Sequence, residues 1–188
     1  MKITRWIAES FGGSVAAEGV VWLPAETAAD AAEETARLFD DLRTPVLRYL
    51  LSMGLSPADG EDVVQEVFVA LFQHLSRGRP RTNLRGWVFR TAHNLGLKAR
   101  LRRRNTNGSA PEDVADGRPG AEEQLAANRR LAKIHAVAQA LPQRDRSCLS
   151  LRAEGLTYRE IAETLGISLG SVSIAIARSV AKIRESDR

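Results

Sequence analysis

Apolar residues recur three or four positions apart through much of the chain, which is the spacing of one buried helix face. The stretch after residue 56 shows this spacing most regularly, at Val64, Val67, Phe68, Leu71, Phe72 and Leu75. Ser56 and Pro57 precede the stripe as a cap and a first-turn proline, and Asp59 completes an arrangement like a capping box. The pattern predicts a helix whose polar residues lie off the buried stripe, among them Asp62, Gln65, Glu66 and Gln73.

A second amphipathic pattern precedes this helix. Residues 27–43 are rich in acids and alanine and predict a helix with its apolar side facing inward. Pro45 either kinks that helix or stands at the first position of another, after Thr44 as its cap. The apolar stripe continues to Met53, and Gly54 closes it.

A long helix is predicted on the other side of a loop. Glycine and proline interrupt the pattern at residues 76–83, which indicates the loop. The helix is expected from near Asn83 to about Arg104. The residues predicted to be buried along it are Leu84, Trp87 or Val88, Leu95 and Leu101.

Two segments lack a strong pattern. Residues 1–30 form a weakly patterned arm to which the sequence assigns no role. Residues 105–120 have no periodicity and are rich in linker residues, so they predict a domain boundary. Beyond that boundary a helical pattern returns over 121–140, and after Leu141-Pro142 another covers 144–153.

The last apolar stripe carries the most specific local motif. Thr157 caps a short helix, and Ser168 caps the next. Ala162, Gly166 and Val172 have the spacing of a helix-turn-helix, in which a small residue permits close approach, glycine takes the turn and a branched residue locks the second helix. A plain helical hairpin without a DNA role is the alternative. In a DNA reader the outward face of the second helix would enter the major groove, with Ser171, Ser173, Ile174, Ala175, Arg178 and Lys182.

Charge is distributed very unevenly. The net charge of +4 hides acidic segments at 26–41 and 112–123. Every charged residue between Glu66 and Glu112 is basic: Arg77, Arg79, Arg81, Arg85, Arg90, Lys98, Arg100, Arg102, Arg103 and Arg104. A run of one sign repels itself unless a polyanion lies against it. Because Trp87 and Phe89 offer faces on which unpaired bases can stack, the block predicts nucleic-acid binding that is partly single-stranded.

The sequence offers little for metal or catalytic chemistry. Its one cysteine, Cys148, provides neither an internal disulfide nor a Cys-rich zinc site. His74, His93 and His135 are scattered, and the basic block contains no carboxylate for a metal-dependent nuclease. No metal, cofactor or catalytic residue is therefore predicted. A catalyst built on His93 is the enzyme alternative.

Location and a non-enzymatic alternative also follow from the sequence. No apolar stretch approaches the ~20 residues that span a bilayer, and the first residues lack the apolar core of a secretory signal. A cytoplasmic protein is expected. A conventional helix-turn-helix regulator with a sensor or dimerisation domain is a second hypothesis, but the acid-free block argues against it.

The motifs, taken in order, resemble one family. EDVVQEVF at 61–68 precedes GWVFRTAHN at 86–94, and after the linker LTYREIAETLGISLGSV follows at 156–172. This order is similar to that of the extracytoplasmic-function (ECF) sigma factors, the smallest class of bacterial RNA polymerase sigma subunits. The resemblance covers roughly residues 35–104 and 125–185.

The resemblance implies an all-α fold of two small helical domains joined by a flexible linker. Residues 1–30 would be an arm and 31–104 a region 2-like bundle. Residues 105–122 would be an acidic linker, and 123–188 a region 4-like helix-turn-helix domain.

The resemblance further implies a promoter-recognition subunit without catalytic activity. Region 2 would bind the clamp helices of core RNA polymerase through Asp62, Gln65, Glu66 and Val69. It would bind the −10 element and the separated non-template strand through Arg79, Arg81, Asn83, Arg85, Trp87, Arg90, Asn94, Lys98, Arg102 and Arg103. Region 4 would rest on the polymerase flap and read the −35 element through Arg159, Ser168, Ser171, Ser173, Ala175, Arg178 and Lys182. An anti-sigma factor is the other expected partner.

Some assignments stay open at this point. Trp87 either stacks on a base or belongs to the core, and Asn94 is either a surface amide or a DNA contact. The family usually has threonine where Ser171 stands and basic residues near Ser173 and Ala175. This departure predicts weaker or altered −35 binding.

Overall fold

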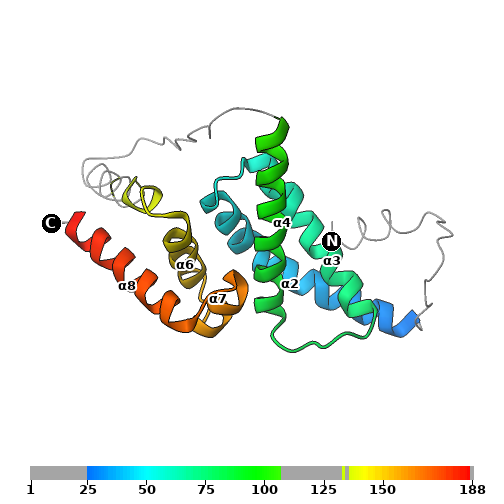
Figure 1. Ribbon diagram of the computed structural model, residues 1–188. Coiled ribbons are helices and arrows are strands. Elements are labelled where there is room, and N and C mark those ends of the chain that lie inside the picture. Colours follow the sequence, from blue (N-terminus) through cyan, green and yellow to red (C-terminus); the bar gives the residue numbers. More distant parts are fainter. Residues whose placement is uncertain (1–24, 107–132, 134–135, 187–188) are drawn as a thin grey trace, which may run out of the picture.

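The computed structural model describes residues 25–106, 133 and 136–186. Within these residues all regular elements are helices. They are α2 (Ala25–Ser52), α3 (Pro57–Ser76), α4 (Leu84–Thr106), α6 (Gln143–Ala153), α7 (Tyr158–Leu165) and α8 (Leu169–Ser186) (Figure 1). The predicted all-α class is confirmed. The expectations for the arm up to residue 24, for the linker from 107 and for a helix over 121–132 lie outside the described residues.

The first three helices form a bundle around one apolar core. α2 runs unbroken through Pro45, so the alternative with a new helix capped by Thr44 is wrong. Its stripe buries Leu42, Val46 and Leu50, none more than 2% exposed. The last turn ends before Gly54, whose φ of 90° is a left-handed conformation that glycine adopts without strain.

The local signals around α3 act as predicted. The Ser56 hydroxyl oxygen accepts a hydrogen bond from the Asp59 backbone N–H at 3.2 Å and so caps the helix. Val64, Val67 and Leu71 are fully buried along one side. The polar residues of α3 therefore point away from the bundle core.

α4 begins at a strained residue. Asn83 has a φ of 52°, and its side-chain oxygen accepts a hydrogen bond from the Gly86 backbone N–H at 3.0 Å. A Cβ atom at Gly86 would come within 2.6 Å of the Asn83 amide nitrogen, so this cap requires glycine there. Two predictions for the helix are wrong. Leu101 is 59% exposed rather than buried, and Phe89 is fully buried, so it offers no face to a base.

The helix-turn-helix is formed by α7 and α8. Thr157 and Glu160 make a reciprocal capping box, and Gly166 ends α7 in the left-handed conformation with φ 65°. The Ser168 hydroxyl oxygen accepts a hydrogen bond from the Ser171 backbone N–H at 3.1 Å, as its predicted capping role requires. Ile161 and Val172 are fully buried between the two helices.

The helix-turn-helix half packs directly on the three-helix bundle. α6 contacts α2, and α7 contacts the first turns of α4 (Figure 1). Tyr49 of α2 is fully buried at this seam, beside Ser147 and Cys148 of α6. The Tyr49 hydroxyl lies 2.7 Å from Nδ1 of His93 on α4. One apolar cluster therefore runs through both halves.

Of the described helices, none is by itself long and apolar enough to cross a membrane. α7 and α8 reach that length and composition only as a pair, which is bent by 106° at the turn. Ile161, Val172 and Ile176 of this pair lie in the protein core.

The burial of the His93 imidazole predicts a pH-dependent stability. Burial lowers the pKa of the His93 imidazole below its usual value near 6.5. As the pH falls through 6.5, the unfolded chain takes up this proton before the folded one, so stability is lost on acidification. We expect the midpoint of thermal unfolding to fall less between pH 7.5 and pH 5.5 (about one unit either side of that pKa) in His93→Gln than in the unaltered protein. His74→Gln is the matched control, and equal pH dependence in all three proteins contradicts the assignment.

Candidate polymerase and nucleic-acid interfaces

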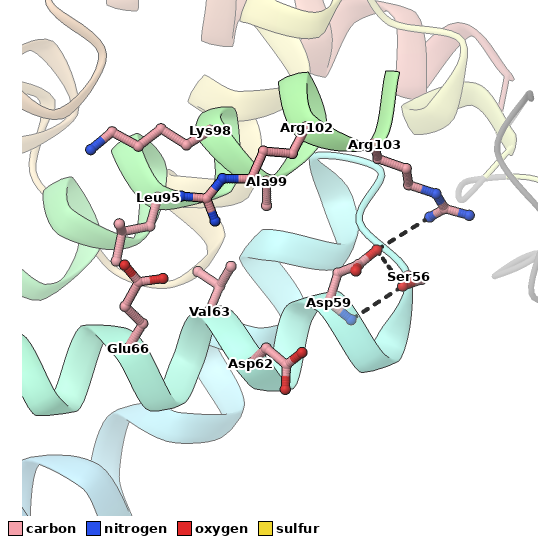
Figure 2. A pocket seen from close by; sticks show the side chains of 10 residues that line it. All are labelled: Ser56, Asp59, Asp62, Val63, Glu66, Leu95, Lys98, Ala99, Arg102 and Arg103. Carbon is pink, nitrogen blue, oxygen red and sulfur yellow. Dashed lines mark hydrogen bonds and ion pairs between the residues drawn. The ribbon is translucent and has the colours of Figure 1, made fainter. Parts of the chain in front are cut away.

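A groove of about 480 Å³ separates the outer sides of α3 and α4. Val63, Leu95 and Ala99 form its floor, and its rims carry opposite charges (Figure 2). Asp59, Asp62 and Glu66 stand on the α3 side, and Lys98, Arg102 and Arg103 on the α4 side. The groove is thus an apolar trough between an acidic and a basic edge.

The predicted polymerase-binding residues share the α3 side of this region. Asp62, Gln65 and Glu66 are exposed, whereas Val69 is half-buried. Figure 2 shows the Asp62 carboxylate pointing away from α4, while Glu66 reaches toward Leu95. Asp59, in the first turn of α3, accepts a hydrogen bond from the hydroxyl of the cap residue Ser56 at 2.6 Å and pairs with Arg103 at 3.4 Å. The exposed acids beside the cap form a continuous polar edge.

The predicted −10 residues fall into separate groups. Lys98, Arg102 and Arg103 line the groove, farther toward the C-terminal end of α4 than the other residues of the set. Arg85, Trp87 and Arg90 lie in the first turns of α4, and Asn83 directly precedes that helix. We call these four residues the arginine face. Asn94 is exposed between the two groups.

The loop 77–83 leads into the arginine face. The Pro80 carbonyl lies 3.0 Å from Nε2 of His74, which ties the loop back to α3. Arg81 pairs with Glu34 of α2 at 2.5 Å, and Arg79 is exposed. Trp87 is half-buried, and its ring packs against His74 with centroids 4.8 Å apart and the planes tilted by 42°. It therefore packs against the core while keeping part of its surface accessible.

The arginine face is already occupied by carboxylates and a carbonyl of the helix-turn-helix half. Arg90 pairs with Glu163 of α7 at 2.9 Å. Arg85 donates a hydrogen bond to the backbone carbonyl of Glu154, at the end of α6. A hollow of about 250 Å³ lies between Thr82, Asn83, Gly86, Trp87 and Arg90 on one side and Glu160 and Glu163 on the other.

Glu154 and Glu160 make further interactions between the helix-turn-helix half and the three-helix bundle. The Glu154 carboxylate accepts two hydrogen bonds from Arg48 of α2, at 2.9 and 2.7 Å, and this pairing raises the pKa of the Arg48 guanidinium. Hydrogen bonds from Thr157, with smaller contributions from Asn83 and Arg85, hold the pKa of the Glu160 carboxyl below its usual range. The Glu160 carboxylate is therefore ionised at neutral pH, opposite the arginines.

Most of the predicted −35 residues belong to α8, which lies on the side of α6 and α7 that faces away from α4 (Figure 1). Ser168, Ser173 and Lys182 are exposed, as is Arg159 on α7, and Ser171 is half-buried. Ile174 adds an apolar side chain that is 64% exposed. This face can approach a DNA groove without rearrangement of the helix-turn-helix.

Two of the predicted −35 residues are not free side chains on the outward face of α8. Ala175 was predicted to face outward, but it is fully buried because it belongs to the apolar core. Arg178 forms a bidentate pair with Asp145, at 2.8 and 3.0 Å. Asp145 is 1% exposed, so Arg178 compensates a buried charge and joins α8 to α6.

Sequence reasoning missed the residues that join the two halves. Arg48 and Tyr49 lie more than 100 residues before Glu154, and these three residues belong to no motif. Glu163 does occur within the helix-turn-helix, at a position whose only local signal is that it lies off the apolar stripe.

For the metal prediction, the described residues contain no group of three or more His, Cys, Asp or Glu side chains that could hold an ion.

Family models match both halves of the chain. The model described as Sigma-70 region 2 matches residues 38–107. The model described as Sigma-70, region 4 matches residues 131–183. The first match covers the bundle with the groove and the arginine face, and the second covers the helix-turn-helix.

Curated relatives agree with these matches. The ECF RNA polymerase sigma factor SigE of Mycolicibacterium smegmatis is 35% identical over 145 residues, which are 74% of this chain and 56% of the relative's length. The chain thus spans little more than half of SigE. ShbA of Streptomyces griseus, also an ECF RNA polymerase sigma factor, is 32% identical over 169 residues, covering 81% of this chain and 87% of ShbA.

Solved structures share the fold. CnrH in complex with the cytosolic domain of CnrY has a TM-score of 0.57 at 26% identity, covering 86% of this chain and 92% of that one. The sigma factor RpoE of Bartonella quintana, in complex with the anti-sigma factor NepR, has a TM-score of 0.63 at 20% identity, with 82% and 96% covered. With a relative such as ShbA matched over most of its length, the chain belongs to the ECF family of RNA polymerase sigma factors.

Proposed function

We propose that this chain is a promoter-recognition subunit that binds core RNA polymerase and directs it to −10 and −35 elements. The observation that carries the proposal is the division of one small protein into three exposed polar surfaces. These are the acidic edge of α3, the arginine face of α4 and the outer face of α8. Each suits a different macromolecule, and none holds catalytic chemistry.

The acidic edge of α3 fits a helical protein partner with basic residues. Asp62, Gln65 and Glu66 project from a helix whose opposite side is fully buried, so they are held on a rigid support. The apolar floor of the adjacent groove supplies surface that a partner helix can cover. We assign this region to the polymerase clamp helices, with Val69 at its margin.

The arginine face and the loop before it fit unpaired DNA. Arginines supply phosphate contacts, and the partly exposed Trp87 ring and the Asn83 amide lie among them around a hollow. Arg79 and Arg81 extend the positive surface along the loop. We assign the binding of the −10 element and the separated non-template strand to the arginine face and this loop. Asn94, Lys98, Arg102 and Arg103 extend this proposed DNA surface along α4.

The outer face of α8 fits duplex DNA. Its exposed groups are small hydroxyls and one isoleucine, with Lys182 and Arg159 as the basic residues at its edges. Such a face gives few bidentate base contacts, so contacts to the DNA phosphate backbone dominate at the −35 element.

The polymerase flap and an anti-sigma protein complete the proposed partners, and the cytoplasm is the proposed location. The two solved structures, each with a second protein bound, support an anti-sigma partner.

The clamp assignment is tested with Asp62→Arg combined with Gln65→Ala. Because both side chains are exposed and off the buried stripe, the variant keeps its fold. We expect its affinity for core polymerase to fall at least about tenfold, as for the loss of interface hot spots. Co-purification with tagged core polymerase measures this. Asp41→Arg with Gln73→Ala makes the same chemical changes elsewhere, and equal retention of both variants on core polymerase contradicts the assignment.

The −10 assignment is tested with Arg85→Ala combined with Arg90→Ala in reconstituted holoenzyme. If both arginines bind phosphates of the single strand, the slope of log affinity against log salt becomes shallower by about 1.4, at about 0.7 per contact. Binding of a promoter fork with an unpaired non-template strand measures the slope. Arg37→Ala with Arg43→Ala, on α2, is the control for total charge. An unchanged slope in the α4 variant removes these residues from the DNA interface.

The overall function is tested by run-off transcription. Core polymerase is incubated on a pool of promoter-length DNA with and without the full chain. New start sites that depend on the chain support the proposal, and the enriched templates identify both elements. DNA binding without new start sites favours a conventional regulator instead.

A further inference from the structure

We infer that the helix-turn-helix half is a built-in competitor for the DNA strand, with Glu154, Glu160 and Glu163 placed against the arginine face where phosphates would bind. The inference rests on the proposed function of that face. It adds that the free protein is closed, and that it must open between α4 and α7 before the −10 strand can bind.

The occupied groups are the ones that a strand needs. Arg90 pairs with Glu163, and Arg85 donates to the Glu154 carbonyl. Asn83, Trp87 and Arg90 share their hollow with Glu160 and Glu163. A guanidinium N–H that is bound to a carboxylate or a carbonyl is not available to a phosphate, and the carboxylates that line the hollow repel one. Arg85 and Arg90 stay partly exposed, so closure and strand binding compete at this face.

The closed state is also held by contacts away from the arginine face. Glu154 forms a bidentate pair with Arg48, which belongs to none of the proposed DNA surfaces. Tyr49 of α2 is fully buried beside Cys148 of α6. These contacts offer a way to open the protein without altering any residue assigned to DNA.

Closure leaves the other DNA surface uncovered. Ser173, Ile174 and Lys182 of α8 stay exposed while α7 lies on α4. The free protein is therefore expected to keep its contact with duplex DNA and to lose only its contact with the single strand. This selectivity separates closure from a general loss of DNA binding.

The first test uses Arg48→Glu in the full chain. The change replaces the bidentate pair with two like charges and lowers the net positive charge, so simple electrostatics predicts weaker DNA binding. Opening predicts the reverse. We expect the affinity for a fluorescein-labelled single-stranded oligonucleotide to rise about tenfold, as for a closed state favoured about ten to one. Arg37→Glu, an exposed arginine on the same helix, carries the same charge change and is expected to bind no tighter than the unaltered protein.

A second variant is needed because breaking the exposed Arg48–Glu154 pair alone can have too small an effect on opening. Arg48→Glu with Glu163→Lys makes both ion pairs of the seam repulsive at unchanged net charge. Arg37→Glu with Glu185→Lys is its matched control. The reaction rate of Cys148, the chain's only cysteine, with a thiol reagent reports opening directly, because that residue is buried at the seam. Circular dichroism confirms that the variants stay helical.

The outcomes separate the inference from the function beneath it. Faster Cys148 reaction and tighter single-strand binding in the seam variants, with duplex binding little changed, support the inference. Single-strand affinity equal to that of the matched controls in both seam variants overturns it, even where run-off transcription upholds the proposed function. Tighter single-strand binding without any polymerase-dependent transcript overturns the proposed function and still supports closure.

Discussion

An arginine-rich surface without acids of its own must be neutralised from elsewhere, and this requirement organises the molecule. α4 begins with arginines, and no carboxylate occurs in the sequence near them. In the folded chain the missing negative charge comes from Glu34 on α2 and from Glu160 and Glu163 on α7. The same electrostatic need that makes the surface suitable for DNA thus draws the second half of the protein onto the first.

α4 can serve several partners because the helical period separates its faces. Val88, Phe89 and Ala92 fill the core, while Arg85 and Arg90 flank them toward α7. Farther along, Lys98 and Arg102 turn toward the groove beside α3 (Figure 2). Since each face has a fixed direction, a change on one face leaves the others in place. One rigid helix therefore links the core, the groove and the arginine face.

The sequence predicted what local chemistry decides. Caps at Ser56 and Thr157, the turn at Gly166 and the stripe of α3 need only neighbouring residues, and all occur as expected. The errors at Leu101, Phe89 and Ala175 arise from helix faces whose inner side depends on which helices pack there. The seam was not predicted, because Arg48 and Glu154 are paired only by the packing of α6 against α2.

The balance between closure and strand binding depends on more than charge. Salt screens the pairs of Arg48 and Arg90 and the phosphate contacts alike, so ionic strength weakens both competitors together. The apolar part of the seam is not screened. Tyr49 of α2 and Cys148 of α6 lose contact with each other only when the halves separate. A partner that covers the exposed edge of α3 leaves this seam intact, whereas one that separates α6 from α2 uncovers the arginine face. Opening is thus controlled where α2 meets α6.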